Sequence, residues 1–299
     1  MVWSDFIQGI LSLSLIGPGI GGNVLMFVGH VYMFVRGPEK RNIDLILMHL
    51  AFTNAMSLCA KGVSDVISAF HLSNFLSNVG CKAVIYLERV ARGLSICTTC
   101  LLSVVQATTI SSKATTWTKF KPQTARQLLH CLLCFWVFNI LIGSNLLYYI
   151  TSVNSMNRSA VTYYVKYCYM QPAEPIVRWL FLTLMAVRDL MFQGLMGWNS
   201  GCMASHLYVH HKCVLYLRSS RFTKKKTTSP EIRATQSILL LMACFLFFYW
   251  ADFIFSFYIG SFLTNELTIF NIKIFLTLGY ASLSPFMLIG RNVHLVHCW

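Results

Sequence analysis

The sequence predicts an all-α membrane protein, a bundle of seven transmembrane helices with its amino terminus outside the cell and its carboxyl terminus in the cytoplasm. Three observations predict this fold. Only 11% of the residues are charged, against about 25% in a typical soluble domain. The apolar residues form seven long runs, and the basic residues are concentrated in alternate connections between these runs.

Each apolar run is long enough to cross a bilayer, because about 20 helical residues span a hydrocarbon core of roughly 30 Å. The runs cover 7–34, 43–70, 81–110, 127–150, 176–209, 234–259 and 267–289. Charged residues interrupt the second run at Lys61 and Asp65 and the fifth at Arg188 and Asp189, so six spans is the main alternative count. We expect the whole chain, 1–299, to form a single domain.

Two prolines lie inside the apolar runs, Pro18 in the first and Pro285 in the seventh. A proline removes a backbone N–H and leaves the carbonyl four residues earlier without its helical donor. We therefore expect both helices to be kinked, with neighbouring helices satisfying the freed carbonyls. The glycine-rich stretch from Gly17 to Gly22 indicates either this kinking or close packing against another helix.

The basic residues predict the orientation of the chain. Of the 24 Lys and Arg residues, 15 lie in one set of connections or near the carboxyl end, five lie in the opposite set, and four lie inside the runs. The positive-inside rule places the richer set in the cytoplasm. The same distribution argues against nucleic-acid binding, because the net charge of +14 is not spread over a soluble face.

A possible glycosylation site agrees with this orientation. Asn157, Arg158 and Ser159 form an N-glycosylation sequon in the connection after the fourth run, which the basic residues place outside. A three-residue motif is often present by chance, so the sequon supports the orientation only together with the distribution of charge.

Two cysteines lie on the same predicted outer side of the membrane. Cys81 begins the third run, and Cys168 lies in the connection between the fourth and fifth runs. Because this side is oxidising, we expect a disulfide that fixes the connection to the top of the third helix. The alternative is two free thiols.

The sequence gives no sign of an enzyme or a metal site. It contains none of the motifs of metalloproteases, serine hydrolases, P-loop enzymes or dinucleotide-binding folds. Two close cysteine pairs lie inside apolar runs without neighbouring histidine or carboxylate, so we expect no zinc there: Cys97 with Cys100, and Cys131 with Cys134. We also expect no cofactor.

Charged residues inside the apolar runs are expensive unless they are paired or hydrated. Lys61 and Asp65 lie four residues apart, so they share a helix face and can pair, and Glu88 and Arg92 can do the same. Glu88 lies seven residues inward from Cys81, roughly 10 Å below it at 1.5 Å per residue, at the depth of a water-filled outer vestibule.

Two interpretations of these charges remain open. They can form an ion-pair network that holds the helices together, or they can line a ligand pocket. The residues that we consider for such a pocket are Glu88, Arg92, Arg188 and Asp252. A structural role is favoured for Lys61, Asp65 and Asp189, whereas the two roles are balanced for Glu88 and Arg92.

The third run resembles the signature of the type 1 vomeronasal receptors. The stretch from Tyr86 to Ala107 reads YLERVARGLSICTTCLLSVVQA. Other segments resemble the same family in the same order: HLAFTN from His49 followed by Lys61-Gly62, Arg188-Asp189 followed by Gly194-Leu195-Met196, RATQSILLLM from Arg233, and Ser284-Pro285-Phe286. The resemblance extends from about residue 20 to residue 290.

The resemblance implies a rhodopsin-like G-protein-coupled receptor in the plasma membrane. It implies detection of small volatile or steroid-like pheromones and signalling through an inhibitory-type heterotrimeric G protein. The cytoplasmic basic residues expected to contact the G protein are Lys113, Lys119, Lys121, Arg221, Lys224 and Arg233. The run of lysines from Lys224 to Lys226 is also expected to contact anionic membrane lipids.

The chain departs from the family pattern at three points. Ser112-Lys113 replaces a usual Pro-Arg, Ser64 replaces a common proline, and Glu88 stands where histidine is frequent. Two other functions remain as alternatives. A bitter taste receptor has the same topology but not the third-run sequence, and a small transporter or channel would account for the charges inside the membrane but predicts inverted repeats between the halves of the chain.

Overall fold

Seven long helices form most of the structure, a computed structural model that describes residues 2–36, 42–69, 78–110, 124–144, 147, 150–152, 168–170, 175–220, 230–262 and 267–289. The helices are α1 (Val2–Arg36), α2 (Asn42–Ala69), α3 (Asn78–Ile110), α4 (Ala125–Gly143), α6 (Pro175–Ser220), α7 (Pro230–Phe262) and α8 (Leu267–Ile289). The prediction of a seven-helix architecture is confirmed. Two short strands, β1 (Ile150–Ser152) and β2 (Cys168–Met170), are an addition that the all-α prediction did not include.

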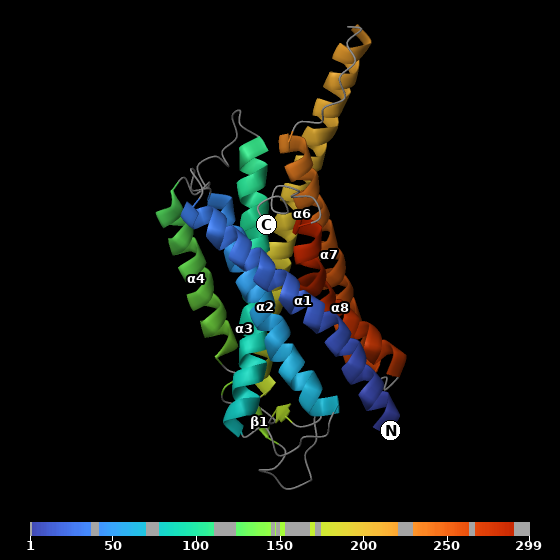
Figure 1. Ribbon diagram of the computed structural model, residues 1–299. Coiled ribbons are helices and arrows are strands. Elements are labelled where there is room, and N and C mark those ends of the chain that lie inside the picture. The colour runs from blue at the N-terminus through green and yellow to red at the C-terminus, as the bar shows by residue number, and fades with distance from the viewer. Residues whose placement is uncertain are drawn as a thin grey trace.

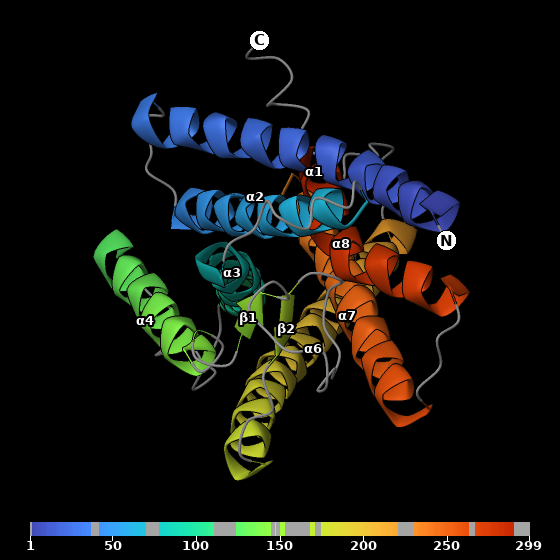
Figure 2. The same ribbon diagram turned by 90° about the horizontal axis from the view of Figure 1, so that it is seen from below.

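Helix α3 lies at the centre of the bundle, with α2, α4, α6 and α7 around it (Figure 2). In its most apolar window 78% of the residues are buried, against 17% in the corresponding window of α4. Helix α1 runs obliquely across α2 and α8 (Figure 1). The central helix therefore presents polar and apolar side chains to nearly every other part of the bundle.

The apolar core surrounds the second half of α3, from Ile96 to Val105. Its fully buried side chains come from six helices besides α3, including Met26 of α1, which explains why the helices hold one arrangement. They include Ile46, Leu50, Ile96, Leu102, Leu128, Met196, Met203, Leu241, Met242, Phe245 and Tyr280. A smaller cluster of Ile16, Leu58, Leu278 and Ala281 joins α1 and α2 to α8.

Helices α1 and α8 approach each other closely because α1 has glycines at the crossing. A Cβ atom on Gly19 would lie 2.8 Å from Ser282 Oγ, and one on Gly22 would lie 2.9 Å from Pro285 Cγ. Pro285 leaves the carbonyl oxygen of Ala281 without its helical donor. Asn23 Nδ2 of α1 donates to that oxygen at 2.8 Å, so a neighbouring helix satisfies the freed carbonyl as predicted.

Five of the helices are long and apolar enough, within the described residues, to cross a membrane. These spans are Gly9–Arg36, Asn42–Asp65, Asn78–Thr109, Ala125–Gly143 and Ile238–Phe255. Helix α8 has a shorter apolar stretch, Phe275–Leu288. Helix α6 has no such span among its described residues.

Helices α4 and α6 end at positions that differ clearly from the ends of their apolar runs, α4 before its run ends and α6 well after. Helix α4 ends at Gly143, although the run continues to residue 150, because Ser144 binds the Leu141 carbonyl oxygen with both its backbone N–H and its hydroxyl. At its other end, Thr124 and Gln127 form a reciprocal capping box. Helix α6 has 46 residues and continues 11 residues past the predicted end at residue 209.

The strands β1 and β2 form a two-stranded antiparallel sheet, in which Thr151 pairs with Tyr169. The sheet lies beside the start of α3, at the same end of the bundle as the amino-terminal end of α1 (Figure 1). At the opposite end, α6 and α7 project together beyond the other helices (Figure 1).

Candidate functional site

An ion pair joins α3 to α7 in the interior of the bundle. Arg92 Nη2 donates to Asp252 Oδ2 at 2.6 Å. The other carboxylate oxygen, Asp252 Oδ1, accepts from Thr277 Oγ1 of α8 at 2.9 Å. The side chain of Asp252 is 6% exposed and that of Arg92 is 25% exposed, so Arg92 is the accessible member of the pair. One carboxylate thus connects three helices.

An aromatic cluster lies directly against this ion pair. The Arg92 guanidinium carbon lies 5.0 Å from the centre of the Tyr249 ring, within the range of a cation–π contact. Tyr249 stacks on Phe245 with ring centres 4.2 Å apart, and Tyr280 of α8 meets Phe245 edge-on at 4.6 Å. The Tyr280 hydroxyl is hydrogen-bonded to Thr99 Oγ1 of α3 at 3.0 Å. Arg92 therefore contacts a ring of α7 that packs, through Phe245, against a ring of α8.

The two ion pairs predicted within single helices have different outcomes. Lys61 Nζ lies 3.2 Å from Asp65 Oδ1, so that prediction is confirmed. The prediction that Glu88 pairs with Arg92 is wrong, because the partner of Arg92 is Asp252 on another helix. Glu88 interacts electrostatically with Lys61 of α2 instead.

Arg188 belongs to a second polar junction, between α3, α4 and α6. Its Nη1 donates to Asn139 Oδ1 of α4 at 2.8 Å, and its Nε donates to Asp189 Oδ1 at 2.8 Å. Arg188 is 3% exposed and Asn139 is 1% exposed. The Asn139 amide also lies 3.6 Å from Cys97 Sγ of α3. The structure therefore brings Arg92 and Asp252 together but places Arg188 in a separate cluster.

Gly93 makes room for this second junction. A Cβ atom at Gly93 would lie 2.0 Å from Asn139 Oδ1 and 2.5 Å from Arg188 Nη1. Real Cβ atoms do not approach polar atoms so closely, so any side chain here would displace both groups. Because Gly93 follows Arg92 directly, the two polar junctions meet at one turn of α3.

Sequence reasoning missed the neutral polar residues that connect the helices. In one group, His49 Nδ1 of α2 is hydrogen-bonded to Thr98 Oγ1 at 2.9 Å, and its Nε2 accepts from Trp136 Nε1 of α4 at 3.0 Å. Further contacts of this kind are those of Asn54 with Ser95 and Ser284 and of Asn199 with Ser103, and His30 of α1 pairs with the carboxylate of Asp44 in α2. The available signal was the helical spacing of Ser95, Thr98, Thr99 and Ser103 along one apolar run.

The residues predicted for the disulfide, the glycan and the G-protein contacts are only partly described by the structure. Cys81 is fully buried near the start of α3, and Cys168 begins β2, but the side chain of Cys168 is not among those described. Arg233 lies in the first turn of α7, again without a described side chain. The other residues outside the described ranges are Asn157, Lys113, Lys119, Lys121, Arg221 and Lys224. Within the described ranges, no group of three or more His, Cys, Asp or Glu residues could hold a metal ion.

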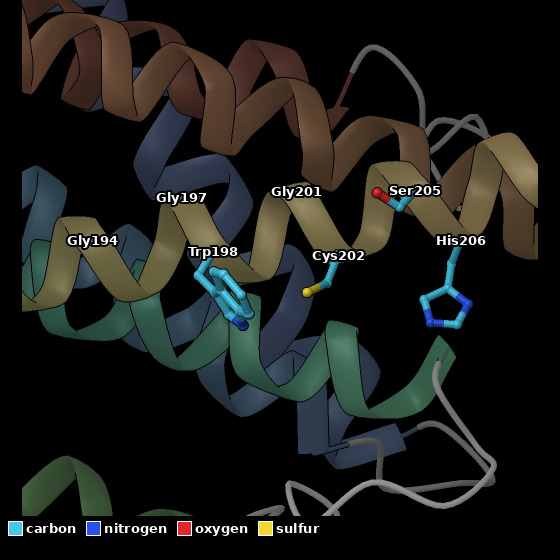
Figure 3. Close-up of a pocket in the computed structure, with 7 residues that line it drawn as sticks. All are labelled: Gly194, Gly197, Trp198, Gly201, Cys202, Ser205 and His206. Atoms are coloured by element: carbon cyan, nitrogen blue, oxygen red, sulfur yellow. The ribbon is translucent and has the colours of Figure 1, made fainter.

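A shallow groove of about 660 Å³ lies along one face of α6. Trp198, Cys202 and His206 project from the same side of the helix (Figure 3). The residues that line the groove are Gly194, Gly197, Trp198, Gly201, Cys202, Ser205 and His206. None of the residues predicted for a ligand pocket is among them, so the groove and the ion pair are different features.

Comparison with known proteins gives one consistent result. The model of the vomeronasal organ pheromone receptor family matches residues 7–299. The chain is 32% identical over 281 residues to vomeronasal type-1 receptor 4 of Homo sapiens, covering 94% of this chain and 92% of that receptor. It is 33% identical over 297 residues to type-1 receptor 51 of Mus musculus, covering 95% and 88% of the two chains. It is also 30% identical over 299 residues to type-1 receptor 40 of Mus musculus, covering 100% and 95%.

Proposed function

Because the chain belongs to the vomeronasal type-1 receptor family, we propose that it detects small, largely apolar pheromones outside the cell and activates an inhibitory-type heterotrimeric G protein. The family consists of membrane signalling receptors and not enzymes, so a small-molecule ligand and a G-protein partner follow in general from membership. Membership also removes the bitter taste receptor as an alternative. The class of ligand, the type of G protein and the location in the plasma membrane are parts of the proposal.

The proposed ligand site is based mainly on the Arg92–Asp252 ion pair. A charged pair inside a membrane bundle is costly and is usually retained for function. Arg92 is one quarter exposed and, within the described residues, donates one hydrogen bond although a guanidinium has five N–H groups. A ligand with a hydrogen-bond acceptor can therefore bind to Arg92, while its apolar body lies among the helices.

In this proposal Glu88 contributes to the rim of the pocket and Arg188 does not contact the ligand. Glu88 is partly exposed on α3, one turn before Arg92, and acts electrostatically on Lys61. Arg188 is almost fully buried and uses three of its nitrogens on Asn139 and Asp189. We therefore propose that Arg188 has a structural role. The proposed ligand pocket is then formed by side chains of α3, α7 and α8.

The proposed switch is the contact between α3 and α7. A ligand that binds Arg92 better when Asp252 has moved shifts the population toward that arrangement. Because Asp252 is part of α7, its movement changes the position of the whole helix. The projecting ends of α6 and α7 (Figure 1) then offer a surface for the G protein, with Lys113, Lys119, Lys121, Arg221, Lys224 and Arg233 as candidate contacts.

The proposed orientation has the amino terminus outside. It is supported by the 15-to-five distribution of basic residues and by the common location of β2, the start of α3 and the start of α1 at one end of the bundle. On that outer side we propose a Cys81–Cys168 disulfide and a glycan on Asn157. The burial of Cys81 and the position of Cys168 at the start of β2 support the disulfide.

The experiment is a screen of pheromone-like compounds on cells that express the chain with an inhibitory-type G protein, with cAMP as the readout. Surface staining selects cells in which the receptor has reached the membrane. A ligand-dependent fall in cAMP that pertussis toxin abolishes is the expected result. Good surface expression without a response to a broad panel, with inhibitory-type and promiscuous G proteins alike, would contradict the proposal.

A further inference from the structure

Three carboxylates lie in the region of the proposed ligand pocket, and they differ in their partners. Both oxygens of Asp252 accept hydrogen bonds, one of them from Arg92. Asp65 Oδ1 lies 3.2 Å from Lys61 Nζ. Glu88 is partly exposed, and within the described residues its interaction is electrostatic, with Lys61. Of the three, Glu88 is therefore the carboxylate to which no described residue donates a hydrogen bond.

The ammonium group of Lys61 is shared among these carboxylates. It forms the ion pair with Asp65 and interacts electrostatically with both Glu88 and Asp252. The second oxygen of Asp65, Oδ2, is buried and has no hydrogen-bond partner in the described part of the chain. One positive charge on α2 thus faces more negative charge than it can neutralise.

The charge count shows the same imbalance. Arg92 and Asp252 compensate each other at 2.6 Å, so Lys61 remains against both Asp65 and Glu88. These three carboxylates and two cations have a net charge of −1. The next residue of α3, Arg89, projects about 100° around the helix from Glu88 and has an interaction of its own. An uncompensated charge inside a membrane bundle is costly, so a cation bound there would be stabilised.

The position of Glu88 relative to Arg92 defines the shape of the site. The two residues are four apart in α3, so they share one helix face and lie roughly 6 Å apart along the helix axis. Glu88 can only accept hydrogen bonds when it is ionised, and Arg92 can only donate. The face therefore presents an acceptor and a donor that are separated by about one helical turn.

We propose that the pocket binds a ligand with a protonated amine, which donates to Glu88, and a hydrogen-bond acceptor about one helical turn away, which binds Arg92. This inference rests on the proposed function, because it names the ligand class of the same pocket. A hydroxyl group could also donate to Glu88, but it would leave the net charge of −1 uncompensated. The apolar body of the ligand lies among α3, α7 and α8.

Ligand-induced thermal stabilisation of the purified full-length chain tests the proposal without a G protein. The probes are the butyl to decyl ethers of trans-4-aminocyclohexanol, whose ring holds an amine and an ether oxygen about one helical turn apart. The matched compounds have a hydroxyl group in place of the amine. We expect an amine to raise Tm, and its hydroxyl analogue to need a roughly 10- to 100-fold higher concentration for the same rise. Equal potency of the two, or no rise with any amine, would overturn the proposal.

Glu88→Gln tests which carboxylate binds the amine. The variant keeps the size of the side chain but removes its charge, so the amine should lose its advantage and the hydroxyl analogue should bind as before. Asp65→Asn is the matched control and should weaken the amine much less, because Asp65 is already paired with Lys61. Each Tm rise is measured against the same variant without ligand. If the two variants weaken the amine equally, Glu88 is not its partner and the proposal is wrong.

The cAMP assay separates this inference from the proposed signalling function. Binding that is selective for the amine, without any fall in cAMP, would contradict the signalling function and support the ligand class. A fall in cAMP with neutral compounds but not with the amines would support the signalling function and overturn the ligand class.

Discussion

Arg92 in α3 and Asp252 in α7 are 160 residues apart in the sequence, and their side chains meet at 2.6 Å inside the bundle. The carboxylate also accepts from Thr277 of α8, and the guanidinium lies over the ring of Tyr249. Removing one member of a buried pair leaves an uncompensated charge and costs about 3–5 kcal/mol when burial is complete. The partial exposure of Arg92 reduces that cost, because water can solvate its guanidinium.

Gly93→Ala should destabilise the receptor although it adds only one methyl group. The new Cβ would collide with Asn139 Oδ1 and Arg188 Nη1, and overpacking of this kind costs about 1–3 kcal/mol. Thermal unfolding of the purified protein should show a clearly lower Tm. Gly197→Ala is the matched control, because nothing among the described residues lies within 4 Å of its Cβ position. Equal Tm values for the two variants would contradict the account of the α3–α4–α6 junction.

Trp136→Phe should weaken the contact between α2 and α4. The substitution keeps an aromatic ring but removes the Nε1–H that donates to His49 Nε2 at 3.0 Å. We expect a loss of about 1 kcal/mol in the free energy of unfolding, the usual value of one hydrogen bond. Trp198→Phe changes a residue that is 65% exposed on α6 and should have a much smaller effect. If both variants lose the same stability, the hydrogen bond to His49 is not the cause.

Cys81→Ser should abolish surface expression or ligand response, because the proposed disulfide holds the connection that contains β2 against α3. The measurement is surface staining followed by the cAMP assay. Cys59→Ser removes a free, exposed cysteine of α2 and should have no effect on either readout. Normal trafficking and signalling in Cys81→Ser would contradict the disulfide.

Asn157→Gln should remove a glycan if the connection between α4 and α6 lies outside the cell. The parent chain expressed in mammalian cells should migrate faster on a gel after treatment with an N-glycosidase, and the variant should not change. Asn157, Arg158 and Ser159 form the only sequon of this chain, so the gel shift reports on one site. A parent chain that reaches the surface with no shift would remove this support for the proposed orientation.

Local sequence features predicted those parts of the fold that depend on short stretches of chain. The run 267–289 coincides with α8, because apolar residues predominate along the whole of this short segment. The Lys61–Asp65 pair was predictable because both residues lie on one helix. The end of α4 was not, since hydropathy does not register the capping contacts of Ser144. The length of α6 was also missed. Hydropathy shows where the apolar residues end, at residue 209, but the helix continues through polar residues to Ser220.

Contacts between helices could not be predicted in the same way. Glu88 is the obvious partner of Arg92 on a single helix, yet the bundle supplies Asp252 from α7. The role of Asn139 could not be predicted from the sequence, because a neutral side chain in an apolar run does not indicate which residue it will bind. Its role depends on Arg188 and on the missing Cβ of Gly93, which come from two other helices.

The most direct test of the proposed mechanism is to replace both members of the Arg92–Asp252 pair together. In Arg92→Leu with Asp252→Leu no charge is left unpaired, and apolar replacement of a buried pair is often neutral for stability. We predict that this double variant reaches the cell surface at the level of the parent receptor but no longer lowers cAMP in response to an activating pheromone. A double variant with an unchanged response would contradict the account, because it would show that neither the ligand site nor the switch depends on this ion pair.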